Sequence, residues 1–94
     1  SSSVTVTAAN GPTTHYIDIE NMAYSPASIT INVGDTIVWE NKDSGPHTVT
    51  ANDGSFDSGY MGSGATFSFT FTSAGTFDYY CAYHSMMTGT VIVQ

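Results

Sequence analysis

Apolar and polar residues alternate with a period of two along most of this chain. The clearest run is Phe67, Phe69 and Phe71, whose intervening residues are Ser or Thr. Successive side chains of a β-strand point to opposite faces of a sheet, so this alternation is typical of a strand with one buried face. We therefore predict an all-β fold of seven to eight short strands, arranged as a sandwich or a barrel. The other segments with this pattern contain Val4 and Val6, Ile17 and Ile19, Ile29, Ile31 and Val33, Ile37 and Trp39, Phe77, Tyr79 and Cys81, and Val91 and Val93.

Segments rich in turn-forming residues separate these runs, and residues that favour helices are scarce. Leu and Arg are absent from the chain, and Lys and Glu are rare. The longest break, residues 52–65, is rich in Gly, Ser and Asp, and we predict a long loop there with at most a short turn of helix. A chain of 94 residues has the size of one domain. We expect a single domain over residues 1–94, in which the Ser-rich residues 1–3 are a flexible start.

The charge balance of the chain excludes several classes of partner. The chain has eight Asp and Glu residues but a single basic residue, Lys42, and its formal net charge is −7. Proteins that bind nucleic acids or anionic membranes need Lys and Arg to contact phosphates, so neither partner is expected. No apolar run reaches the ~18 residues of a membrane span, so we expect no membrane insertion of this domain. No pattern typical of a hydrolytic nucleophile or a phosphate-binding loop is present, so an enzyme is not the favoured class.

Soft metal ligands gather near the end of the chain. Cys81, His84 and Met87 fall within seven residues after a predicted strand, and His47 follows a Gly-Pro pair upstream. Thiolate and thioether sulfur stabilise Cu(I), imidazole suits both oxidation states, and two His with one Cys and a weakly bound Met are typical of copper electron-transfer sites. We therefore predict one copper per chain, bound by these four residues. Cys81 is the single cysteine, so an intrachain disulfide is excluded.

Two features of this predicted site have alternatives. Zinc also binds Cys and His, usually with four strong ligands, and His15 would be a candidate for the fourth. We interpret His15 instead as an ordinary, partly exposed strand residue. Met86 and Met87 are adjacent, and only the spacing favours Met87 as the axial ligand. Water would occupy the axial position if neither sulfur reached the metal.

Several segments in a fixed order resemble one known family. They are Tyr24-Ser25-Pro26, residues 33–39, Asn41 with Pro46-His47, residues 74–81, and His84, Met87 and Gly89-Thr90-Val91. Over residues 15–94 the chain resembles the cupredoxins, the small blue copper proteins, and it is most similar to the amicyanin and plastocyanin group. The resemblance implies a Greek-key β-sandwich with copper near one end. It also implies that His47, Cys81 and His84 are equatorial ligands and that Met87 is the axial ligand, in a short amicyanin-like loop.

The chain departs from the usual pattern of these proteins at the ligand loops. Ala82 stands where they usually have Ser or Thr, whose hydroxyl helps to tie the loops together through Asn41. Thr48 stands where many have Asn, and Tyr83 and Ser85 replace prolines on either side of His84. We therefore expect a less rigid ligand loop and altered hydrogen bonds around the metal.

The resemblance implies a one-electron carrier between redox proteins that dock near His84. An apolar patch is expected to surround this residue, formed by Gly45, Pro46, Tyr83, Met86 and Met87, with Met61 as a further candidate. The alternative is a copper site with an open or water-filled axial position that reacts with a small molecule such as nitric oxide. We expect a monomer in an extracytoplasmic location, such as the periplasm or the cell surface, tethered there in the full-length protein.

Overall fold

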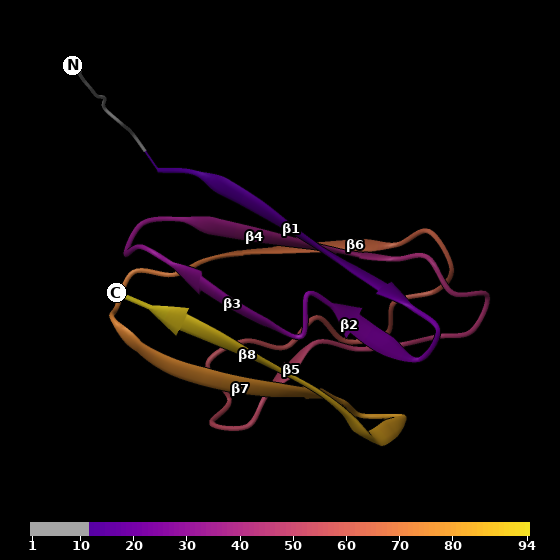
Figure 1. Ribbon diagram of the computed structural model, residues 1–94. Coiled ribbons are helices and arrows are strands. Elements are labelled where there is room, and N and C mark those ends of the chain that lie inside the picture. Colours follow the sequence, from indigo (N-terminus) through magenta and orange to yellow (C-terminus); the bar gives the residue numbers. More distant parts are fainter. Residues whose placement is uncertain (1–11) are drawn as a thin grey trace.

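The computed structural model describes residues 12–94, apart from the side chain of Ser85, and these residues form a two-layered sandwich (Figure 1). Its strands are β1 (Thr14–Glu20), β2 (Ala23–Ser25), β3 (Ser28–Ile31), β4 (Thr36–Asn41), β5 (Thr50–Ala51), β6 (Thr66–Thr70), β7 (Gly75–Cys81) and β8 (His84–Val93). This architecture confirms the predicted all-β sandwich of seven to eight strands. The predicted run around Val4 and Val6 lies outside the described residues. Within the described part of the chain, no long apolar helix that could span a membrane occurs.

Each layer is a sheet of four strands that contains one parallel pair. The orders are β2-β1-β4-β6 and β3-β8-β7-β5, in which β1 is parallel to β4 and β3 is parallel to β8. Successive strands from β2 to β7 lie in alternate sheets, so the chain crosses repeatedly between the layers, as in a Greek-key sandwich. The strands β1, β4 and β7 end on the same side of the molecule, beside the turn between β7 and β8 (Figure 1). Segments that follow these strands therefore meet there, although they are far apart in the sequence.

The core between the sheets is centred on Trp39. The side chains of Ile37, Trp39 and Tyr79 are fully buried, as the alternation predicts. The Trp39 ring is stacked on Phe67, with ring centroids 5.6 Å apart, and on Phe56, with centroids 5.7 Å apart. Burial of each large apolar side chain contributes about 1.5–3 kcal/mol to folding. This packing holds β4 and β7, which lead into the ligand segments, in fixed positions.

The predicted long loop over residues 52–65 is irregular, and it contains no turn of helix in the structure. Phe56 and Met61 are buried and anchor it to the core. The backbone of Met61 also forms two hydrogen bonds with that of His47, with N···O distances of 2.9 and 3.0 Å. These anchors hold the chain extended, so the predicted loop forms without the short turn of helix that the sequence analysis allows.

The segment after Cys81, which the sequence suggests is a loop, is mostly strand. β7 ends at Cys81 and β8 begins at His84, so two residues form the turn between them. Cys81 pairs with His84 across this turn, whereas Tyr80 pairs with Thr88. Three extra residues of β8 therefore form an irregularity in the ladder. The backbone pairing of β7 and β8 continues almost to the turn and places Cys81 opposite His84.

Candidate metal centre

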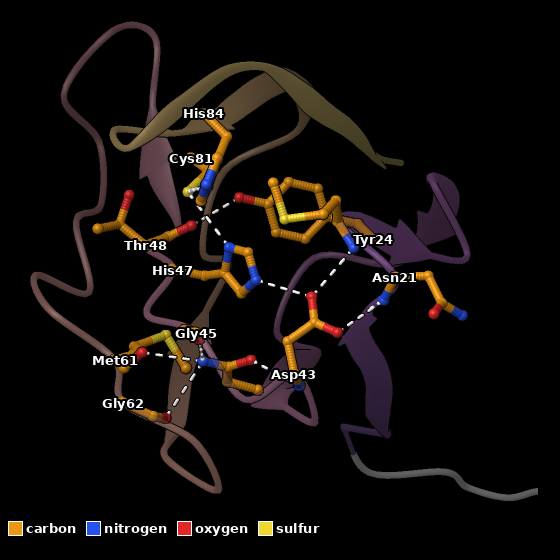
Figure 2. A network of polar contacts seen from close by, with 12 residues as sticks. Asn21, Tyr24, Asp43, Gly45, His47, Thr48, Met61, Gly62, Cys81 and His84 are labelled. Carbon is orange, nitrogen blue, oxygen red and sulfur yellow. Dashed lines mark hydrogen bonds and ion pairs between the residues drawn. The ribbon is translucent and has the colours of Figure 1, made fainter.

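Three side chains bring their donor atoms together where β7 meets β8 (Figure 2). The Cys81 Sγ lies 3.6 Å from the His47 Nδ1 and 3.5 Å from the His84 Nδ1. The three donor atoms all lie within 4.8 Å of one another. His47 comes from the segment between β4 and β5, and the other two residues come from the ends of β7 and β8. One thiol sulfur and two imidazole nitrogens that face a common point can hold one metal ion.

The donors differ in their access to solvent. His47 and Cys81 are fully buried, whereas His84 is partly exposed. The metal position that they define therefore lies beneath the surface, and the His84 ring connects it to the outside. A buried position with one exposed ligand suits the movement of an electron better than the entry of a large substrate.

Asp43 fixes the tautomer of His47. The His47 Nε2 lies 2.8 Å from the Asp43 Oδ2. A carboxylate only accepts hydrogen bonds, so Nε2 carries the proton and the Nδ1 lone pair faces Cys81. Asp43 also accepts hydrogen bonds from the backbone N–H groups of Met22, at 3.0 Å, and Asn21, at 2.7 Å. The hydrogen bond from Met22, together with those from His47 and Asn21, lowers the pKa of Asp43 below its ordinary value.

The two adjacent methionines of the ligand segment have opposite environments. Met87 is 4% exposed and belongs to the core, whereas Met86 is 91% exposed. A thioether must be withdrawn from solvent to serve as a weak ligand of a buried metal. Burial therefore favours Met87 over Met86, in agreement with the spacing in the sequence.

Asn41 is fully hydrogen-bonded although Ala82 offers it no hydroxyl. Its Nδ2 donates to the backbone carbonyls of Gly45 and Met61, both at 2.9 Å, and its Oδ1 accepts from the Asp43 N–H at 3.0 Å (Figure 2). These bonds tie the segment that carries His47 to the long loop. The sequence predicts the loss of one partner but not the partners that replace it.

Thr48 joins the two ligand segments in place of the hydroxyl that Ala82 lacks. Its Oγ1 accepts a hydrogen bond from the Ala82 N–H at 2.7 Å, and its carbonyl accepts one from the Tyr24 hydroxyl at 2.6 Å. Burial raises the pKa of Tyr24 far above its ordinary value, so this hydroxyl remains a donor. Thr48 is a residue whose role the sequence reasoning missed. The sequence does contain an indication of this role, because the residue directly after His47 carries a hydroxyl group.

His15 lies apart from the three donors. Its Nε2 is 3.0 Å from the Asp35 Oδ2, and it pairs with Ile37 near the start of β4. The metal donors gather beyond the opposite end of that strand, after Asn41. His15 is therefore not placed to complete a four-ligand zinc site, and it is partly exposed, as interpreted from the sequence.

The surface around His84 differs in part from the predicted patch. Met87 and Met61 are buried and do not contribute to it. Two further apolar side chains do: Met22 is 50% exposed, and the ring of Tyr60, which is 70% exposed, lies with its centroid 6.4 Å from that of Tyr83. Met22 and His84 line two neighbouring cavities of about 340 Å³ each. We call the exposed residues Met22, Pro46, Tyr60, Tyr83 and Met86 the His84 surface.

Comparisons with known proteins agree with this geometry. Residues 12–94 match the family described as copper binding proteins, plastocyanin/azurin family. Amicyanin from Paracoccus denitrificans is 36% identical in an alignment of length 88, and the match covers 83% of this chain and 63% of that protein. Plastocyanin from Scenedesmus fuscus is 31% identical in an alignment of length 86, and the match covers 78% of this chain and 88% of that protein. The chain thus spans less than two thirds of the length of the amicyanin that it matches.

Solved structures show the same similarity in three dimensions. An oxidised mutant of amicyanin superimposes with a TM-score of 0.80 at 34% identity, covering 85% of this chain and 81% of its own. A purple cupredoxin from Nitrosopumilus maritimus superimposes with a TM-score of 0.79 at 32% identity, covering 85% of this chain and 99% of its own.

Proposed function

Because this chain belongs to the plastocyanin/azurin family of copper-binding proteins, we propose that it carries single electrons between redox partners by means of one copper ion. His47, Cys81 and His84 would hold the ion as its strong ligands, and Met87 would supply a weak fourth ligand. The observation that supports the proposal most strongly is the convergence of one thiol and two imidazoles within 4.8 Å at one end of the sandwich.

The donor set and its surroundings fit copper. Copper bound there would supply a one-electron Cu(II)/Cu(I) couple, and a thiolate with two imidazoles suits both of its oxidation states. Asp43 holds the His47 ring, and the backbone ladder of β7 and β8 holds Cys81 opposite His84. Ligands held in this way move little when the charge of the site changes, so the transfer of an electron needs little rearrangement.

The His84 surface provides the place where a redox partner docks. The His84 ring joins the buried donors to this surface, and the five residues that form the surface carry no charge. An uncharged, apolar contact area is readily desolvated and suits brief association. The partner is a second redox protein, and the domain acts as a monomer in an extracytoplasmic location, tethered in the full-length protein.

The visible spectrum and the electron paramagnetic resonance (EPR) spectrum test this function directly. One equivalent of Cu(II) should produce an intense thiolate-to-copper band, and Cys81→Ser should abolish it because the thiolate is its source. His15→Gln is the matched control and should retain the band, since His15 bonds to Asp35 instead. An intense band in the Cys81→Ser protein would contradict the proposed ligands.

A further inference from the structure

The Asp43 carboxylate accepts three hydrogen bonds, which come from two parts of the chain. Its Oδ2 accepts from the His47 Nε2–H at 2.8 Å and from the Met22 N–H at 3.0 Å, and its Oδ1 accepts from the Asn21 N–H at 2.7 Å. Its own N–H donates to Asn41. Figure 2 shows the carboxylate between the His47 ring and the Asn21 backbone. The Asp43 side chain is 21% exposed and that of His47 is 1% exposed, so water has little access to the bond between them.

The turn that faces Asp43 has an unusual backbone. Asn21 and Met22 have φ angles of 55° and 60° and connect Glu20 to Ala23. A two-residue hairpin turn with both φ angles positive normally carries Gly at its second position, and Met is disfavoured there. The two N–H groups of this turn both donate to Asp43, which stabilises the conformation. The carboxylate is therefore held by the fold as well as by His47.

The position of this carboxylate determines its effect on a metal at the Nδ1 side of His47. A negative charge hydrogen-bonded to Nε2–H makes the imidazole a stronger donor. The oxidised metal carries one more positive charge than the reduced metal, so a nearby negative charge favours the oxidised form. A neutral acceptor in the same position would fix the ring without this preference.

We propose that Asp43 is a positioning residue that lowers the reduction potential of the copper site through its charged hydrogen bond to His47. This inference rests on the proposed function, because it requires copper at His47. It goes beyond that function by assigning the control of the potential to a residue that does not touch the metal.

The decisive variant is Asp43→Asn, which keeps an acceptor oxygen for the His47 Nε2–H and removes the charge. Spectroelectrochemistry of the copper-loaded protein should show that the ratio of oxidised to reduced protein at a fixed applied potential falls about tenfold. For a one-electron couple this change equals about 59 mV. Asp43→Glu, which retains the charge, should return the potential toward that of the parent protein.

Asp78→Asn is the matched control, since it removes the same charge from an exposed residue of β7 and keeps an acceptor for the Thr90 hydroxyl. In this control, the ratio of oxidised to reduced protein should change less than twofold. If Asp43→Asn retains the intense band but shifts the ratio no more than Asp78→Asn, the inference is overturned. If the parent protein shows no band that depends on Cys81, the proposed function itself fails.

Nuclear magnetic resonance on the reduced, diamagnetic parent protein provides a second test that needs no variant. The ¹⁵N spectrum should show a proton on the His47 Nε2 that exchanges slowly with water, because Asp43 accepts it in a nearly closed position. A rapidly exchanging proton, or an Nε2 without a proton, would overturn the inference even if Asp43→Asn fails to take up copper.

Discussion

At the scale of single residues, Met86 and Met87 show how two adjacent, identical side chains can differ in their exposure to solvent. Met87 is buried and Met86 is almost fully exposed. A thioether favours Cu(I), whereas an amide oxygen is a harder donor that favours Cu(II). We therefore expect Met87→Gln to lower the reduction potential and to change the visible spectrum. Met86→Gln should leave both nearly unchanged, as measured by spectroelectrochemistry.

The same pair of variants tests the alternative site with an open axial position. If neither variant moves the potential or the spectrum, both sulfurs lie outside the coordination sphere. Azide added to the copper-loaded parent protein should then change the spectrum strongly. A closed site with Met87 bound should show little change with azide.

The candidate ligands could be predicted from the sequence, but the residues that hold them could not. Cys81 and His84 are three residues apart, and the chemistry of their side chains alone limits the candidate metals to copper and zinc. The carboxylate of Asp43, which orients His47, is held by the backbone N–H of Met22, 21 residues away in the sequence. Thr48 acts through the Ala82 N–H, 34 residues away. Such contacts depend on which strand ends meet in the fold. The alternation of apolar and polar residues does not predict which strand ends meet.

At the scale of elements, the bond from Ala82 to Thr48 joins the turn after β7 to the segment between β4 and β5. Thr48→Val replaces the hydroxyl with a methyl group of similar size and leaves the Ala82 N–H without its acceptor. This bond is partly buried, and a typical hydrogen bond contributes about 0.5–1.5 kcal/mol to stability. We expect a loss of this size in the free energy of unfolding, measured by urea denaturation of the metal-free protein.

Thr48→Ser keeps the hydroxyl and is the control for this prediction. It should retain most of the stability and the slow exchange of the Ala82 amide proton, whereas Thr48→Val should lose both. A stable Thr48→Val protein together with a destabilised Thr48→Ser protein would show that the methyl group, rather than the hydrogen bond, stabilises the two segments.

The elements themselves show where periodicity is informative and where it is not. Runs such as Phe67 to Phe71 predict strands correctly, because each has one face against the core. Residues 52–65 contain no such run, yet Phe56 and Met61 are buried within them. A single anchoring side chain has no period, so its burial depends on the cavity that other elements leave for it. The same limit explains why the alternation of residues does not identify Tyr60 as part of the His84 surface.

At the scale of the whole molecule, charge and contact area are largely separated, although the partly exposed Asp43 lines a cavity beside His84. The net charge of −7 comes from residues outside the His84 surface, whose five residues are uncharged. The field of the molecule should therefore attract cations toward it at long range, while the final contact is apolar. Salt should weaken the first effect and leave the second unchanged. The Debye length falls from about 30 Å at 0.01 M to about 8 Å at 0.15 M ionic strength.

Two small oxidants of opposite charge distinguish these contributions for the copper-loaded, reduced protein. Stopped-flow oxidation by a cationic cobalt(III) complex should slow several-fold as the salt concentration rises over this range, because attraction is screened. Oxidation by the ferricyanide anion should accelerate over the same range, because repulsion is screened. The reduction potential measured in each buffer corrects for changes in driving force. Rates that respond alike to salt for both oxidants would mean that the net charge does not steer encounter, and that the apolar His84 surface alone governs the approach of a partner.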